Sequence, residues 1–166
     1  MEARAHLRAC VGCAAMVPDI DGPTHRYIGA SPGCWALYGE LAEKEAGDFR
    51  YMRSHQLTVD AAYCARHPGV PSPQAVRSVA VHLVGLHFQL ERQLERDLPA
   101  ERLYAARQRV ATLGKQGKLG LRWLEVPASL GAVTVLDVLA AKDPAEHARR
   151  ARGWAESVWE AWMAHH

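Results

Sequence analysis

The chain has 166 residues, of which 49% are hydrophobic, and its formal net charge at pH 7 is +2. These values predict one globular domain, residues 1–166, with a substantial core. The weak net charge gives no sign of nucleic-acid or membrane binding. No apolar run approaches the roughly 20 residues that span a bilayer, and we see no apolar segment typical of a secretory signal. We therefore expect a cytoplasmic protein whose cysteines stay reduced.

Three cysteines and a histidine gather between residues 10 and 34, in a stretch rich in turn-forming residues. Cys10, Cys13, His25 and Cys34 have the spacing C-x2-C-x11-H-x8-C. Thiolates and imidazoles at such spacings are typical of tetrahedral zinc sites. The intervening VPDIDGPTH predicts a loop with little apolar content, so a metal ion would supply its cross-links. The sequence thus predicts a structural Cys3His zinc knuckle over residues 10–34, with these four side chains as ligands.

The fourth ligand is the least determined member of this set. His25 lies in the same loop as the cysteines. His55 is the rival, because a helix antiparallel to the one that begins near Cys34 could bring it close. Cys64 lies in an expected helix and is better explained as a small buried residue. A redox-active C-x2-C pair typically lies in a βαβ unit, and the sequence shows no such unit around the motif.

After the knuckle, the sequence predicts a helical bundle over residues 33–166, which makes the fold mainly α. Ser-Pro and Asp-Pro pairs, which suit helix N-termini, precede three of the expected helices. The expected helices carry apolar stripes at three- and four-residue spacing, and these stripes must be buried on one another. The expected helices cover residues 33–45, 49–66, 74–96, 99–113, 134–141 and 145–163. The Gly- and Lys-rich stretch before residue 134 predicts a loop, in which Leu119–Val126 could form a short strand.

Two histidines and an aspartate fall on or near the apolar faces of neighbouring expected helices. His55 and Asp60 lie in the second helix, His67 stands where that helix stops at His67-Pro68-Gly69, and His82 lies in the third. Bundles build metal centres from side chains on facing helices, so within this constellation His55, Asp60 and His82 are candidates for a second metal site. The alternative is that each histidine is a core residue with a backbone or carboxylate partner. His87 and His147 are expected at exposed helix positions.

The most basic stretch lies between residues 102 and 122, with Trp123 beside it. Cations next to an aromatic ring could bind phosphate or single-stranded nucleic acid. A solvated surface explains the stretch better, because the net charge of the whole chain is only +2. Its basic residues are Arg102, Arg107, Arg109, Lys115, Lys118 and Arg122.

Several motifs together resemble an uncharacterised bacterial family of unknown function. They are the C-x2-C pair, DGPTHRYIGASPGCWALYGE, HQLTVDAAY, HPG, SVAVHL and WLEVPASLGAVTVLDVLAA. The likeness covers nearly the whole chain from Cys10 onward. Members commonly carry Pro after the first cysteine and Gly after the second, where this chain has Val11 and Ala14. The resemblance implies one recurring fold and no known activity.

Two functions from different classes remain open at this point. In the first, zinc has a structural role in a binding or adaptor module. In the second, a metal held by histidines between helices, or by three ligands with an open position, supports hydrolytic or redox chemistry. A closed site with four protein ligands favours the first function, and an open fourth position favours the second.

Overall fold

The structure is a computed structural model, and it describes residues 6–51, 58–90 and 100–166. These residues form a mainly helical fold, as the sequence predicts, and a small hairpin lies near the N-terminus. In the hairpin, β1 (Leu7–Ala9) pairs antiparallel with β2 (Met16–Pro18). The helices are α1 (Pro32–Gly47), α3 (Asp60–Arg66), α4 (Pro73–Leu90), α5 (Ala100–Lys115), α6 (Val135–Leu139) and α7 (Pro144–His165).

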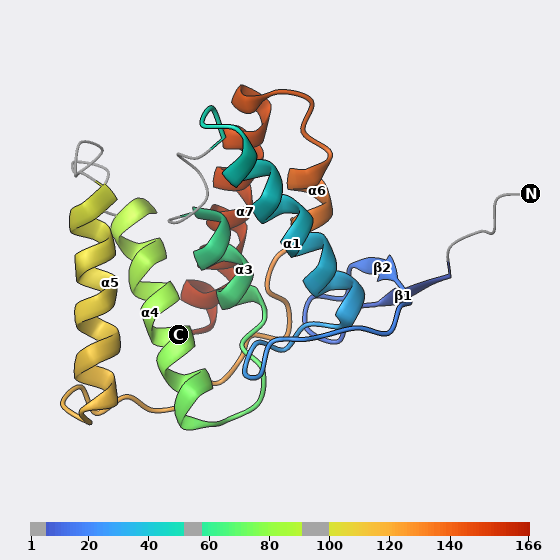
Figure 1. Cartoon of the computed structure of the whole chain (residues 1–166). Helices are drawn as coiled ribbons and strands as arrows, with labels where there is room; N and C mark the ends of the chain where they lie inside the picture. The colour runs from blue at the N-terminus through green and yellow to red at the C-terminus, as the bar shows by residue number, and fades with distance from the viewer. Residues whose placement is uncertain (1–5, 52–57, 91–99) are drawn as a thin grey trace, which may run out of the picture.

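The hairpin and α5 lie at opposite ends of the molecule, with α3 and α4 between them (Figure 1). α3 packs against α4 and α7, α4 packs against α5, and α1 packs against α6. The core contains fully buried aromatic residues, among them Tyr63, Trp154 and Trp162. The same hydrophobic cluster includes Val17 of the hairpin and Cys34 of α1. The N-terminal loops are therefore packed onto the bundle.

Local hydrogen bonds explain where several helices begin. Asp143 caps α7 by accepting a hydrogen bond from the Glu146 N–H, and Thr134 and Asp137 form a capping box at α6.

The expected helix over 49–66 is wrong at its start. Residues 49–51 form a turn, because the Asp48 carboxylate accepts hydrogen bonds from the Arg50 backbone and guanidinium.

The segment after α5 also differs from the sequence prediction. Residues 119–126 form no strand; they follow α5 in turn and irregular conformation. Parts of three expected helices, residues 52–57 and 91–99, lie outside the described residues. Within the described ranges, no helix is both long and apolar enough to cross a membrane.

His147 is fully buried, which corrects the expectation that it lies at an exposed position. Its Nε2 lies 2.6 Å from Oε1 of Glu45, and both side chains are 0% exposed. The ring of Tyr51 meets the imidazole edge-on at 5.1 Å. His147 precedes Ala151 and Trp154 on the buried stripe of α7, at four- and seven-residue spacing. This contact thus joins α1 to α7 inside the core.

Candidate metal centre

Four potential metal ligands meet where the hairpin, α1 and α3 come together. The Sγ atoms of Cys10, Cys13 and Cys34 and a ring nitrogen of His67 all lie within 4.8 Å of one another. All four residues are buried, with Cys34 at 0% and His67 at 1% exposure. Three segments distant in the sequence therefore supply one Cys3His group that could bind a metal ion.

The spacing of the donor atoms fits a metal ion with tetrahedral coordination. The Cys13 and Cys34 sulfurs lie 3.9 Å apart, and Nε2 of His67 lies 3.5 Å from the Cys34 sulfur. Zinc forms bonds of about 2.3 Å to sulfur and about 2.0 Å to nitrogen. At tetrahedral angles, two sulfur ligands then lie about 3.8 Å apart, and a sulfur lies about 3.5 Å from the nitrogen. The side chains could hold such an ion with little rearrangement.

A tight turn directs the first two cysteines inward. The Ala14 N–H donates to the Cys10 carbonyl, and the Cys10 N–H donates to the Ala15 carbonyl. Ala14 has a φ of 58°, a left-handed conformation that suits glycine far better than alanine. This is the position after the second cysteine, where the family resemblance in the sequence leads us to expect glycine. The chain therefore makes the turn at a cost in backbone strain.

Gly12 has no room for a side chain. A Cβ at this position would lie 2.0 Å from the Gly29 carbonyl oxygen and 2.6 Å from Cδ2 of His67. The glycine between Cys10 and Cys13 thus lets the histidine ring approach the turn.

A backbone hydrogen bond orients His67. His67 follows α3, and its Nδ1 lies 2.8 Å from the Tyr63 carbonyl oxygen. Because a carbonyl can only accept, Nδ1 carries a proton, and Nε2 is the ring nitrogen that faces the cysteine sulfurs and would bind a metal ion once deprotonated. Zinc-binding histidines commonly have their second nitrogen fixed in this way. The Gly29 N–H also donates to the His67 carbonyl, which ties the knuckle loop to the end of α3.

Further hydrogen bonds reach the cysteines. The Ser31 N–H donates to the Cys10 sulfur at 3.5 Å, and the Tyr63 hydroxyl donates to the Cys34 sulfur at 3.6 Å. One guanidinium nitrogen of the buried Arg66 donates to the Cys13 carbonyl at 3.2 Å, while the other binds the Gly131 carbonyl at 2.7 Å. Donors around thiolate ligands offset their negative charge, as outer-shell groups of metal sites do.

The three thiols strongly affect each other's ionisation. Hydrogen bonds with Cys13 and Cys34 lower the pKa of Cys10 far below its ordinary value, whereas hydrogen bonds with Cys10 and Cys13 raise the pKa of Cys34. Burial acts to lower the pKa of His67, but its hydrogen bonds with Cys10 and Cys13 outweigh burial and raise the pKa to about 9. The group thus lowers the pKa of both Cys10 and Cys13, which favours their thiolates, and resists ionisation of Cys34. A divalent cation would remove that resistance and displace the protons.

The structure brings together Cys10, Cys13 and Cys34, as the sequence predicts, but the fourth member is His67. His25 lies apart from this group: its Nδ1 accepts from the Tyr27 N–H at 3.5 Å, and its ring packs against Tyr27 and Trp35. The rival candidate, His55, lies outside the described residues.

The antiparallel arrangement of α1 and α3 explains why His67 lies beside Cys34. Cys34 lies beside His67, whereas Tyr38, one turn later in α1, stacks on Tyr63, one turn earlier in α3. The two helices therefore run antiparallel, so the end of α3 lies beside the start of α1. His67 stands at that end, in the HPG motif, where the sequence indicates a helix stop and a member of the second histidine constellation but not a ligand of the cysteine site.

A second group of donors surrounds Asp60, with two of its members anticipated from the sequence. Nε2 of His82 lies 3.3 Å from Asp60 Oδ2, and the Cys64 sulfur lies 3.7 Å from Asp60 Oδ1. Asp60, Cys64 and His82 could hold a metal ion. However, Arg107 of α5 binds the same carboxylate at 2.5 Å, and Nδ1 of His82 lies 2.6 Å from the Ser78 carbonyl. These contacts favour a buried ion-pair network at this position.

The fold and the site define a small helical protein with a buried Cys3His group that could bind a metal. The chain belongs to a family of unknown function (DUF5946), whose model matches residues 8–163. This membership agrees with the resemblance drawn from the sequence motifs. No match was found among curated proteins or solved structures.

Ala14→Gly should stabilise the protein by about 0.5–1 kcal/mol. The left-handed conformation costs an alanine about 1–2 kcal/mol, and the greater chain entropy of glycine offsets part of that gain. Urea unfolding of both proteins measures the change. Ala36→Gly, at an exposed position in α1, is the matched control and should destabilise by about 0.5–1 kcal/mol. Equal destabilisation by both substitutions would contradict the strain at Ala14.

Asp60→Asn should reduce stability at pH 7 by roughly 2–3 kcal/mol, because it weakens charged hydrogen bonds to buried groups. Burial acts to raise the pKa of Asp60, but His82 and Arg107 hold it well below its ordinary value. The carboxylate therefore stabilises the folded state above its unfolded pKa of about 4, and this contribution is lost as the pH falls below that value.

Urea unfolding between pH 2 and 7 tests this dependence. The stability difference between the parent and Asp60→Asn should shrink below pH 4, where thiol protonation will already have weakened any metal binding in both proteins. Asp19→Asn is the control, because Asp19 forms only an exposed ion pair with Arg8. A difference that stays constant down to pH 2 would contradict the role given to the Asp60 charge.

Proposed function

We propose that Cys10, Cys13, Cys34 and His67 bind one zinc ion, and that this ion has a structural role in a binding or adaptor module. The observation that carries the proposal is the convergence of four buried donors within 4.8 Å. Three sulfurs and one imidazole at tetrahedral spacing suit zinc, because structural zinc sites have four such protein ligands in a tetrahedral arrangement. A cytoplasmic location, where thiols stay reduced, fits the proposal.

Burial supports a structural role over a catalytic one. A catalytic zinc ion keeps a position for water or substrate, typically beside three protein ligands. Here four protein donors surround the same point, and both Cys34 and His67 are almost completely buried. The enzyme alternative would need the group around Asp60, whose carboxylate is bound by Arg107. The Cys3His group therefore supports a closed structural site.

The ion would order the loops that form one surface of the protein. Gly12 lies between the first two ligands, Gly29 binds His67 through its N–H, and Gly69 follows His67 by two residues. These glycines line a cavity of about 400 Å³, and Gly29 and Gly69 also line one of about 300 Å³. A metal that fixes the walls of two surface cavities is suited to a module that binds other molecules.

The protein as purified should contain about one zinc ion per chain, and His67→Asn should abolish that content. His25→Asn is the matched control and should leave zinc in place, because the His25 ring packs on Tyr27 and Trp35 away from the sulfurs. Cys34→Ser should behave like His67→Asn. Elemental analysis, with protein counted by amino-acid analysis, gives the stoichiometry, and circular dichroism checks that each variant is folded.

Two results would contradict this proposal. One is folded parent protein that contains no zinc and takes up none when zinc is added. The other is zinc loss in His25→Asn with full retention in His67→Asn, which would return the fourth position to the knuckle loop.

A further inference from the structure

A small cavity lies between α4 and α5, away from the Cys3His group, and we propose that it binds a small molecule carrying a phosphate group. Its volume is about 220 Å³. Its walls come from the first half of α4, the end of α5 and the loop before α1. The polar residues that line it are Tyr27, Gln74, Arg77, Ser78, His82 and Lys115.

The charged residues that line this cavity are all positive. Arg77 enters from α4 and Lys115 from α5, and no acidic residue lines the walls. Among the described residues, no carboxylate forms an ion pair with either cation. Two cationic residues on the walls of one small hollow favour an anion there. A phosphate monoester carries a charge of about −1.5 to −2 at pH 7 and would nearly neutralise the pair, whereas one carboxylate would neutralise half of it.

Neutral groups on the same walls suit phosphate oxygens. Gln74 and Ser78 lie one turn apart on α4 and offer amide and hydroxyl donors. Gln74 also belongs to the first turn of α4, where the helix dipole favours negative charge. Donors from side chains and a helix start often combine with basic side chains to bind phosphate.

The nearby carboxylate of Asp60 does not oppose an anion here. His82 stands between the cavity and Asp60, with one ring nitrogen at Asp60 and the other at the Ser78 carbonyl. Arg107 binds the Asp60 carboxylate as well. The negative charge behind the wall is thereby paired, so the cavity itself keeps the charges of Arg77 and Lys115.

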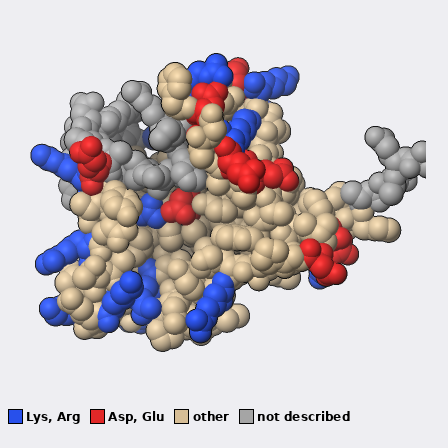
Figure 2. Space-filling view, in the orientation of Figure 1, with Lys and Arg blue, Asp and Glu red and all other residues tan. Residues whose placement is uncertain are grey.

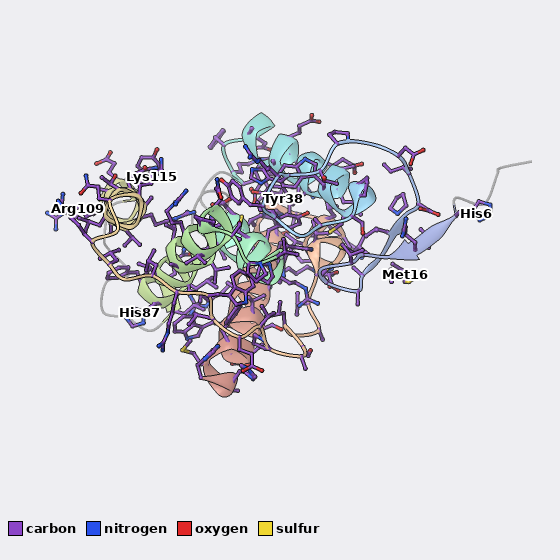
Figure 3. The ribbon with its side chains drawn as sticks, turned by 90° about the horizontal axis from the view of Figure 1, so that it is seen from below. His6, Met16, Tyr38, His87, Arg109 and Lys115 are labelled. Carbon is purple, nitrogen blue, oxygen red and sulfur yellow. The ribbon has the colours of Figure 1, made fainter. Side chains whose placement is uncertain are left out.

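The cavity differs from the ordinary basic surface around it. Lys and Arg side chains gather over the α5 side of the molecule (Figure 2). Arg109 and Lys115 leave α5 in different directions (Figure 3). Ala111 and Lys115, four residues apart, both line the cavity, whereas Arg109 does not. Arg109 therefore provides a control for charge outside the cavity.

Titration calorimetry with inorganic phosphate tests the proposal, at fixed pH and at an ionic strength held constant with chloride. We expect saturable binding of one phosphate per chain. Arg77→Gln and Lys115→Gln should each weaken it at least tenfold, and Arg109→Gln should change it less than twofold. Lys115 is exposed, so Lys115→Gln leaves the core intact and keeps the test decisive if Arg77→Gln folds poorly. Thermal unfolding without phosphate checks the fold of each variant.

Companion titrations with glycerol 3-phosphate and acetate define the ligand. Tighter binding of the ester supports an organic phosphate, and tighter binding of inorganic phosphate supports the free ion. Acetate that binds as tightly as phosphate would overturn the assignment. Heat that never saturates, or equal weakening by Arg77→Gln, Lys115→Gln and Arg109→Gln, would overturn it too, because either result indicates screening of a basic surface.

Discussion

The N-terminal half of the structure depends on four donor side chains that meet inside the protein. Buried thiols and an imidazole within 4.8 Å of one another resist further ionisation unless a cation balances them. Their positions fix where the hairpin, the start of α1 and the end of α3 must lie. With zinc bound, the free energy of metal binding would become part of the free energy of folding for these segments.

Packing around the group makes this convergence specific. Gly12 leaves space for the His67 ring, and Gly33 does the same for the hairpin, since a Cβ there would lie 2.0 Å from the Pro18 carbonyl oxygen. Ser31 caps nothing with its side chain, which instead accepts a hydrogen bond from the Val11 N–H. Arg66 links Cys13 to the loop at Gly131. Each contact joins the segments that carry the four donors to the bundle, which explains why these segments share the core of the helices.

The sequence predicted the helical class, most helix positions and three of the four clustered donors, because these follow from periodicity, caps and local spacing. It did not identify His67, since that residue is distant from the cysteines in sequence and serves visibly as a helix stop. His147 is expected at an exposed position, but the structure buries it against Glu45, which is 102 residues away. Contacts between distant segments decide both positions: His67 meets the cysteines, and His147 meets Glu45.

X-ray absorption at the zinc edge tests the central claim most directly, because it reports the ligand atoms around the ion itself. The account predicts three sulfur ligands at about 2.3 Å and one imidazole nitrogen at about 2.0 Å, with no oxygen ligand. The same spectrum should lose its imidazole contribution in any His67→Asn protein that still retains zinc. A parent spectrum with an oxygen ligand, or with fewer than three sulfurs, would contradict a closed Cys3His site formed by Cys10, Cys13, Cys34 and His67.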